Sequence, residues 1–374
     1  MKVLVLDPGR HALDSAFFTS GQGGPVHVAH DSGQGEAKTE LKALMPLLHK
    51  TLASARKVCP DAPEAIGIRV AFGGSEFTGP TLVDGRVTRS LKALGPQAPL
   101  HVPAVVTLLQ GCREVLPDTP VVLVFETAFF TRLPAREYLY GLNRETSRSL
   151  SLRRRGFHGI YHEAACEHMR YERRRSGQCP PARILSICLD PHPEIAAVAA
   201  GRPLLTTGGA TPLEGIPGHT TCGDLDPSIV LMLAQRKQWG PEQINAMLTR
   251  DSGLLGMTGK TATLAEVLGS TDDHMQLARQ VIEYRILLAC GAGIAAMGGL
   301  DGIVFSGRFA AAGAALGPLL ASRLAFKGGL GERGVPWMCF PESLHRLIAD
   351  QTAAVILKEH GGQPDEALEE RLAS

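Results

Sequence analysis

Two short stretches, roughly half the chain apart, begin in the same way: an apolar, strand-like run leads into Leu-Asp-Pro. The first copy occupies residues 3–8 and the second 184–191. In each copy a turn follows, and the chain returns in a second apolar run, at 16–18 and at 195–199. Three shared residues alone are a weak repeat, but both copies follow strands. The pattern predicts a duplicated α/β fold whose halves each open with a strand-turn-strand unit.

The rest of the chain alternates strand and helix patterns. Strands are predicted at 65–72, 120–125, 301–305 and 336–340, and helices at 39–59, 273–297 and 342–360. The 374 residues exceed the size at which a single core stops growing, about 250–300 residues. We therefore expect an α/β protein of two domains, 1–150 and 151–374, with the closing helix at 342–360 able to pack back on the first.

Charge and cysteine content exclude several classes of protein. Lys and Arg number 38 and Asp and Glu 37, so the net charge of +1 leaves no electrostatic footprint for nucleic acid or a membrane surface. The eight cysteines form no Cys-x-x-Cys pair, which argues against a zinc site. No apolar run reaches the roughly 20 residues of a membrane span without a glycine-rich interruption. A reduced, cytoplasmic protein without nucleic-acid or membrane partners is expected.

Acidic residues at the ends of predicted strands are the first candidates for a functional site. Asp7 and Gly9 stand at the tip of the first strand. Glycine there lets backbone N–H groups approach phosphate oxygens, and Asp can hold Mg²⁺ through water; an ordinary turn is the alternative. Glu126 follows an apolar strand, where α/β sheets place catalytic carboxylates, or it caps the next turn. Glu214, in the rigid turn TPLEGIPG, is either an ion-pair partner or a site residue, and we favour the structural role.

Basic candidates lie beside glycines. Arg69 stands near a strand end next to Gly73 and Gly74, where a fixed guanidinium binds a carboxylate or a phosphate; a buried ion pair is the alternative. His158 and His162 have the i, i+4 spacing of a metal-binding helix, but the flanking glycines indicate a loop that enters a helix. We expect His158 to be a neutral hydrogen-bond donor in a cleft and His162 to be structural.

Taken together, these stretches resemble the acetate kinase family. The matching segments, in family order over most of the chain, are VLVLDPG, GIRVAFGG, APLHVPAVV, VVLVFETAFF, EYLYGLN, RRRGFHGIYHEAA, TTGGATPLEGIPGHTTCGDLDPSIV, SGLLGMTGK and DGIVFSG. The resemblance implies a duplicated actin-like (ribonuclease H-like) fold, with two domains and a cleft between them. It also implies phosphoryl transfer between ATP or ADP and a small, acetate-like carboxylate or its acyl phosphate, with Mg²⁺ as cofactor, in a homodimer.

The resemblance gives roles to individual residues. Arg69 matches the family's first catalytic arginine, and Glu126 matches its essential aspartate, one methylene longer. His158 matches the histidine that contacts the phosphoryl group in the transition state, and His101 matches a histidine of the substrate-side loop. The other implied positions are Gly73 and Gly74 (with Arg69 and His101) for substrate, Asp7, Gly9, Gly307 and Arg308 for phosphate, and Asp7 and Glu126 for Mg²⁺.

The loops that would bind nucleotide phosphates depart from the family pattern. The first hairpin reads DPGRHA where the family has Asn-x-Gly-Ser-Ser-Ser, so hydroxyl donors are lost. The second reads CLDPH where the family has His-Leu-Gly-Asn-Gly, which removes two glycines and adds the negative charge of Asp190. Thr221 falls where the family has its second catalytic arginine, in Gly-Thr-Arg-x-Gly.

Two functions therefore stay open. The first is an altered but active phosphotransferase in which Arg69, Glu126 and His158 converge in the cleft. The second is a catalytically silent family member that serves as a binding, regulatory or scaffold protein. A different chemistry in the same cleft is a third, lesser alternative. The contacts of the loops at 190–194 and 308–311 are the observation that separates the first two.

Overall fold

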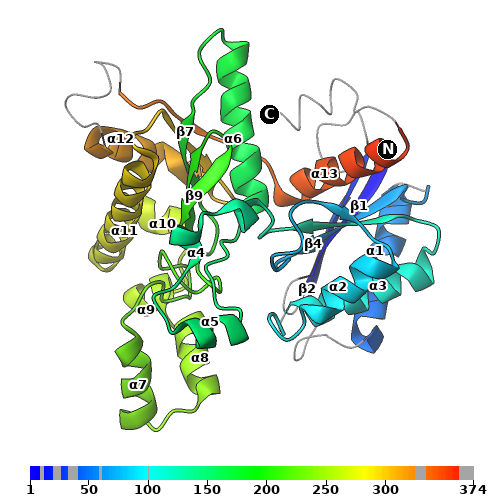
Figure 1. Cartoon of the computed structure of the whole chain (residues 1–374), viewed down its shortest axis with the longest axis horizontal. Helices are drawn as coiled ribbons and strands as arrows, with labels where there is room; N and C mark the ends of the chain where they lie inside the picture. Colours follow the sequence, from blue (N-terminus) through cyan, green and yellow to red (C-terminus); the bar gives the residue numbers. More distant parts are fainter. Residues whose placement is uncertain are drawn as a thin grey trace. The chain divides into compact units, whose positions relative to one another are not determined.

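The polypeptide passes from one structural unit to a second and then returns to the first (Figure 1). In the computed structural model, unit 1 comprises Met1–Thr131 and Glu342–Ser374, and unit 2 comprises Arg132–Pro341. The structure describes residues 1–8, 12–19, 27–32, 41–58, 61–99, 101–324 and 334–361. The first crossing thus lies upstream of residue 150, and the closing helix belongs to unit 1.

Unit 1 is built on a six-stranded sheet in the order β3-β2-β1-β4-β6-β5. Its central strands β1, β4 and β6 are parallel, whereas β2, β3 and β5 pair antiparallel with their neighbours. The hairpin of β1 and β2 is the predicted strand-turn-strand unit. The bounds are β1 (Lys2–Pro8), β2 (Ala12–Thr19), β3 (His27–Ser32), β4 (Ala65–Val70), β5 (Thr81–Leu82) and β6 (Val121–Phe125).

Helices cover both faces of this sheet. Side chains of a strand alternate between faces, so Leu4 and Leu6 of β1 enter the core on the side of α1 and α3. The opposite face is covered by α13, which contacts β1, β4 and β6 (Figure 1). The bounds are α1 (Leu41–Val58), α2 (Gly85–Ala93), α3 (Val102–Val115) and α13 (Leu344–Glu359).

Unit 2 repeats this topology. Its five-stranded sheet has the order β11-β10-β7-β8-β9, with β7, β10 and β11 parallel and the meander β7-β8-β9 antiparallel. Reversed, this order places β7, β8, β9, β10 and β11 where unit 1 has β1, β2, β3, β4 and β6, so the predicted duplication is confirmed. The bounds are β7 (Arg183–Cys188), β8 (Glu194–Ala199), β9 (Arg202–Thr206), β10 (Gly302–Ser306) and β11 (Trp337–Cys339).

Two long helices cover the sheet of unit 2. Leu185 of β7 enters the core on the side of α11 (Asp273–Met297), whereas the next residue, Ser186, meets His162 of α6 (Gly159–Arg175) on the other face. The shorter elements are η1 (Phe129–Arg132), α4 (Ala135–Tyr138), α5 (Arg144–Ser149), α7 (Pro227–Arg236), α8 (Pro241–Arg250), α9 (Gly253–Thr258), α10 (Leu264–Gly269), η2 (Ala310–Ala312) and α12 (Gly313–Leu324). Asp226, the N-cap of α7, accepts a hydrogen bond from the backbone N–H of Ser228.

A glycine in the same strand of each unit lets the covering helix approach closely. A Cβ added to Gly67 of β4 would lie 2.3 Å from Oγ1 of Thr352 in α13. A Cβ added to Gly302 of β10 would lie 2.4 Å from Cε of Met169 in α6. In both units, a glycine in the equivalent strand therefore lets one helix pack closely on the sheet. Helix α13 covers the sheet of unit 1 in the way that α6 covers the sheet of unit 2.

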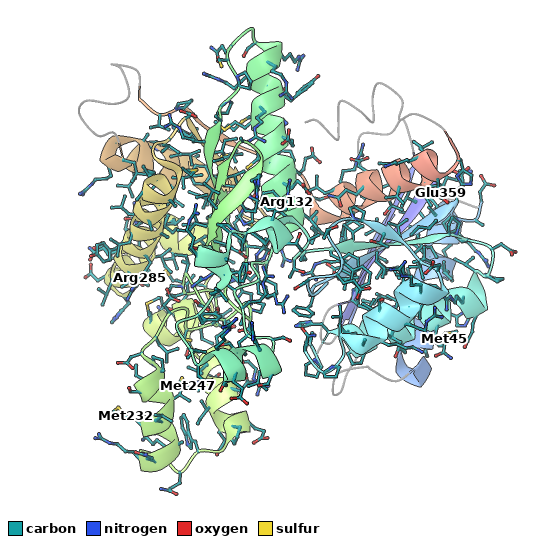
Figure 2. All side chains as sticks on the ribbon, in the orientation of Figure 1. Met45, Arg132, Met232, Met247, Arg285 and Glu359 are labelled. Carbon is teal, nitrogen blue, oxygen red and sulfur yellow. The ribbon has the colours of Figure 1, made fainter. Side chains whose placement is uncertain are left out.

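One helix among the described residues, α11, is long and apolar enough to cross a membrane by length and composition alone. Its buried residues, which include Ile282, Ile286 and Cys290, pack on β8 and β9. The outward face is exposed, and Figure 2 shows Arg285 on it. One face of α11 therefore belongs to the core of unit 2, whereas the other face carries exposed apolar residues such as Leu277.

Candidate active site

In unit 1, three charged residues converge at the carboxyl ends of neighbouring parallel strands. Asp7 stands near the end of β1, Arg69 is the penultimate residue of β4, and Glu126 directly follows β6. Nε of Arg69 donates to Oε1 of Glu126 at 2.8 Å, and its Nη1 donates to Oδ1 of Asp7 at 2.9 Å. The backbone N–H of Glu126 continues the ladder by donating to the carbonyl of Val70 at 3.0 Å. Strand pairing therefore fixes this group of residues, the Arg69 cluster.

The Arg69 cluster is charged and largely buried. The side chains of Glu126, Asp7 and Arg69 are 2%, 15% and 25% exposed. Burial by itself would lower the pKa of Arg69, but the two carboxylates outweigh it and raise that pKa, so the guanidinium is permanently charged. Within the described residues, Oε2 of Glu126 is buried without a hydrogen-bond partner. An orphaned carboxylate oxygen beside a fixed cation is a position for a ligand.

These residues were also the ones predicted to hold Mg²⁺. In the part of the chain that the structure describes, no group of three or more His, Cys, Asp or Glu side chains could hold a metal ion. Mg²⁺ commonly takes only one or two protein carboxylates and completes its shell with water and phosphate oxygens. Oε2 of Glu126 is an oxygen of that kind, and Oδ2 of Asp7 lies 4.0 Å from Nε2 of His345. The donor set fits the ion.

Of the other residues predicted for the site in unit 1, Gly73 and Gly74 lie in the loop that follows β4. The N–H of Gly73 donates to Oγ1 of Thr127 at 2.9 Å, and Gly74 has φ +65°, so both glycines shape the loop after β4. His101 is exposed at the N-terminus of α3 and makes none of the described contacts of the Arg69 cluster. Gly9 lies outside the described residues.

In unit 2, His158 lies between two carboxylates. It has φ +52° at the N-cap of α6, which directs its ring toward the hairpin of β7 and β8. Nδ1 of His158 lies 3.2 Å from Oε2 of Glu194, and Nε2 lies 3.7 Å from Oδ2 of Asp190. Burial alone would lower the pKa of His158, but hydrogen bonds and charges from Asp190 and Glu194 raise it to about 10. The imidazole is therefore a cation at neutral pH, in contrast to the neutral donor expected from the sequence.

The predicted phosphate loop meets the same hairpin. Gly307 has φ +89°, and the N–H of Arg308 donates to Oδ1 of Asp190 at 3.2 Å. Two backbone bonds flank this contact: Leu189 N–H donates to Ser306, and Phe309 N–H donates to Leu189, both at 2.8 Å. The loops at 190–194 and 308–311 are thus in direct contact through the carboxylate of Asp190.

His162 does not share a site with His158. It is fully buried in α6, and its Nδ1 lies 2.8 Å from Oγ of Ser186 in β7. Burial first, and then the charge of His158, lower its pKa well below the usual value, so it stays neutral. The structural role expected for His162 agrees with these contacts.

Sequence reasoning missed Glu194. This residue opens β8, and its side chain is 4% exposed. It accepts from the N–H of Phe157 at 3.0 Å and from Oγ1 of Thr206 at 2.5 Å, besides facing His158. A glutamate at the first position of an otherwise apolar strand, PEIAAVA, was the available signal, but an acidic residue after proline is equally typical of a turn.

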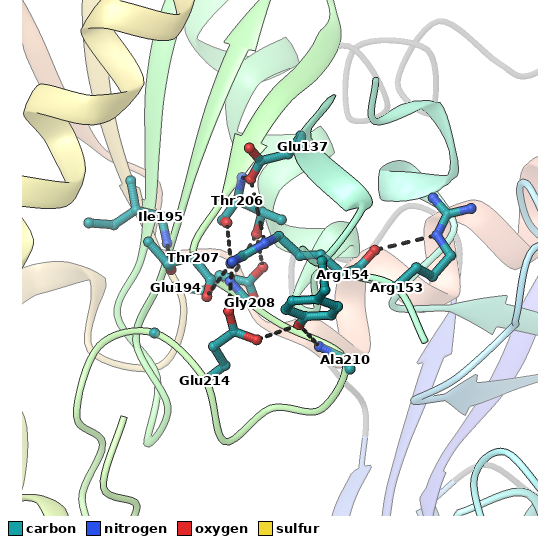
Figure 3. A network of polar contacts seen from close by, with 12 residues as sticks. Glu137, Arg153, Arg154, Glu194, Ile195, Thr206, Thr207, Gly208, Ala210 and Glu214 are labelled. Atoms are coloured by element: carbon teal, nitrogen blue, oxygen red, sulfur yellow. Dashed lines mark hydrogen bonds and ion pairs between the residues drawn. The ribbon is translucent and has the colours of Figure 1, made fainter. Parts of the chain in front are cut away.

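A polar network extends from Glu194 to Glu214 (Figure 3). Glu214 accepts from Nη2 of Arg154 at 2.6 Å and from the hydroxyl of Tyr140. Arg154 also donates through Nη1 to the carbonyl of Thr206 at 3.1 Å, the residue whose hydroxyl binds Glu194. Because both carboxylate oxygens of Glu214 are engaged inside the fold, the network holds the TTGGATPLEG loop in place, and Glu214 is the ion-pair partner of Arg154.

Several known proteins are similar to this chain in sequence. The sequence profile of the Acetokinase family matches residues 14–328. Acetate kinase of Fervidobacterium nodosum is 36% identical over 252 residues, which are 65% of this chain and 60% of that protein. Acetate kinase of Syntrophobacter fumaroxidans is 38% identical over 256 residues, 67% of this chain and 61% of that protein. The aligned part thus spans less than two thirds of these relatives.

Solved structures agree on the fold. The Porphyromonas gingivalis acetate kinase structure has a TM-score of 0.80 at 23% identity and covers 95% of this chain and 99% of its own. A propionate kinase from Francisella tularensis has a TM-score of 0.78 at 23% identity, with 94% of this chain and 99% of its own covered.

Proposed function

This chain belongs to the acetokinase family, and we propose that it transfers a phosphoryl group between a phosphate donor and a small, acetate-like carboxylate. The observation that carries the proposal is the Arg69 cluster. There, a fixed guanidinium and an unpartnered carboxylate oxygen stand at adjacent strand ends. Acetate and propionate kinases among the relatives and structural neighbours support the class of acceptor.

Phosphoryl transfer depends on positioning and on stabilisation of charge rather than on covalent chemistry by the protein. Asp7 and Glu126 bind Nη1 and Nε of Arg69, and no contact of Nη2 is made within the described residues, so we assign Nη2 to an oxygen of the carboxylate or of the transferred group. Glu126, held by Arg69 on one oxygen, presents the other toward the ligand. His158 is a second fixed cation, and we propose that it contacts the phosphoryl group.

Mg²⁺, when bound, neutralises charge on the phosphate oxygens during transfer. Glu126 and Asp7 are the residues that would hold it, directly or through water. The carboxylates of unit 1 therefore have two tasks: they orient Arg69 and they balance the ion.

The residues of unit 2 that would bind the phosphates of a nucleotide fit this role less well. A polyphosphate needs unpaired donors, whereas the N–H of Arg308 and Nε2 of His158 already face the carboxylate of Asp190. The loops at 190–194 and 308–311 are in contact with each other, the observation that favours the silent alternative. A binding or regulatory protein that retains the Arg69 cluster of unit 1 is therefore the second candidate function.

The assembly proposed is a homodimer formed through α11. Leu277, Tyr284 and Leu288 are 66%, 58% and 50% exposed at spacings of seven and four residues, and the exposed Ala292 and Ala295 continue the row. Such a row forms one helix face that can pack against its own copy about a two-fold axis. Light scattering should give a dimer mass for the native chain and a monomer mass for Leu288→Arg, with Leu231→Arg on α7 as the matched exposed control.

The activity is tested by incubating the chain with Mg²⁺, short carboxylates and a series of phosphate donors, phosphate monoesters as well as ATP, and trapping any acyl phosphate as its hydroxamate. Glu126→Gln should lower the rate by about a hundredfold or more, since it removes a charge from the reacting site. Glu163→Gln, which removes a surface partner of Arg132, is the matched control. Absence of product with every donor and carboxylate, together with no heat on titration of the carboxylates, would reject the phosphotransferase in favour of the silent candidate.

A further inference from the structure

Three segments of unit 2 converge on one carboxylate. Asp190, in the turn between β7 and β8, accepts from the N–H of Arg308 at 3.2 Å through Oδ1. The same oxygen lies 3.7 Å from Nε of Arg308, and Oδ2 lies 3.7 Å from Nε2 of His158. The Asp190 side chain is only 17% exposed, so these contacts are made in a largely enclosed position.

The partners of Asp190 are groups that typically bind phosphate. They are a backbone N–H that follows a glycine with φ +89°, an imidazolium and a guanidinium. Phosphate oxygens are recognised by donors of this kind, at short range and with charge assistance. Asp190 brings an anion of this chain to the place where such donors meet.

The local charge is balanced without any ligand. His158 and Arg308 are the cations, and Asp190 and Glu194 are the anions, two of each sign. The other histidines nearby add no charge: burial lowers the pKa of His192 to about 4, and Nε2 of His219 accepts from the N–H of Leu264 at 3.1 Å. A polyphosphate that enters this cluster would therefore meet a balanced site with a carboxylate at its centre.

We propose that Asp190 is a resident anion that determines donor specificity: it takes the place of a phosphate between Arg308 and His158 and excludes polyphosphates from the native site. Replacing its charge should convert the cluster into an anion site. This inference rests on the proposed function, since it treats unit 2 as the side of the phosphate donor. It identifies a residue that decides whether the family's nucleotide can be used.

The test is calorimetric titration of the full chain with inorganic pyrophosphate at low and at physiological ionic strength. Asp190→Asn and Asp190→Ala should bind pyrophosphate at least about tenfold more tightly than the native chain, because a like charge a few ångströms from the ligand is removed. Asp190→Glu keeps the charge and should bind as weakly as the native chain. Asp251→Asn removes an exposed charge at the end of α8 and controls for net charge.

Thermal unfolding with and without pyrophosphate shows whether each variant folds and gives a second readout. Pyrophosphate should raise the melting temperature of the two uncharged variants only. The inference is overturned if the native chain binds pyrophosphate as tightly as they do. It is also overturned if both fold and neither binds, since the anion site would then not exist.

Activity distinguishes this inference from the proposed function. If the native chain phosphorylates a carboxylate with Mg-ATP as donor, the function stands and the exclusion by Asp190 fails. If Asp190→Asn gains pyrophosphate binding while no variant forms an acyl phosphate, the exclusion stands and the phosphotransferase fails.

Discussion

At the scale of single residues, the guanidinium of Arg69 holds two carboxylates together near the ends of three strands. Glu126 is almost fully buried, and Asp7 is largely so. Charges in such a position are tolerated only as a compensated group, because each one alone would pay the cost of leaving water. The site is therefore also a structural element of unit 1, and changes in it alter stability and ligand binding together.

Arg69→Met should destabilise unit 1 by about 3–5 kcal/mol, because it leaves two buried carboxylates facing each other without a cation. Urea unfolding followed by circular dichroism measures the loss. Arg132→Met breaks an exposed pair with Glu163 and should cost less than about 1 kcal/mol. Equal effects of the two substitutions would contradict the account of a compensated buried group.

His158 should make stability depend on pH. The pKa of a histidine in the unfolded chain is about 6.5, and the carboxylates of Asp190 and Glu194 raise that of folded His158 to about 10. The folded state then holds a proton that the unfolded state has lost. The stabilisation by His158 is complete below about pH 6.5 and is lost as pH rises through about 10.

The comparison is the native chain against His158→Gln, by urea unfolding at several pH values. Their difference in unfolding free energy should shrink by up to about 1.4 kcal/mol per pH unit between about pH 7 and pH 9. His274→Gln, at an exposed position in the first turn of α11, is the matched control. A difference that is constant with pH would mean that His158 is neutral in the folded protein.

Much of unit 1's site could be predicted from the sequence, and the charge state in unit 2 could not. Asp7, Arg69 and Glu126 each follow or end an apolar run, and the ends of parallel strands meet at one edge of a sheet. The charge of His158, by contrast, is set by Asp190 and by Glu194, which is 36 residues away in the chain, so the sequence around His158 does not reveal it. Only the pairing of β7 with β8 and the start of α6 bring the two together.

At the scale of elements, the close approach of α13 to β4 depends on Gly67. Gly67→Ala would place a methyl group 2.3 Å from Oγ1 of Thr352, a hydroxyl that already donates to the carbonyl of Ile348. The helix must then move outward, at a cost of about 1–3 kcal/mol. Gly85→Ala, whose new methyl would meet only the far end of Arg89, is the matched control and should be close to neutral.

Denaturant unfolding of the two variants gives the costs, and hydrogen exchange locates them. Amides of β4 and α13 should exchange faster in Gly67→Ala, whereas those of β7 and α6 should not change. Faster exchange in both units would show that the packing of α13 is not confined to unit 1.

The elements that the sequence predicts well are the buried ones. Strands β1, β4, β6, β7 and β10 are continuous apolar runs, and α11 and α13 have long helical patterns. The edge strands β3, β5 and β9 were not predicted from the sequence. Strand β3 mixes polar and apolar residues, β5 has only two residues, and β9 contains Pro203. These segments become strands because each pairs with a neighbouring strand of its sheet: β3 with β2, β5 with β6 and β9 with β8.

At the scale of the whole molecule, unit 1 needs two separate parts of the chain. A chain that ends after Pro341 lacks α13, which leaves the β1, β4 and β6 face uncovered, so unit 1 should unfold while unit 2 keeps its structure. Hydrogen exchange should show lost protection in β4 and β6 and retained protection in β7 and β10. A chain that ends after Gly361 retains α13 and is the control; loss of unit 1 in that control as well would assign its stability to residues beyond the helix.

The return of the chain to unit 1 also sets an order of events on the ribosome. Residues 132–341 are contiguous, so unit 2 can fold as soon as it has left the exit tunnel. The strands of unit 1 emerge earlier. One apolar face of their sheet stays uncovered until α13 is made, some two hundred residues after β6. During that interval the nascent protein presents a sheet with one open face, the kind of surface that chaperones recognise, and the half that is made first is the half that is finished last.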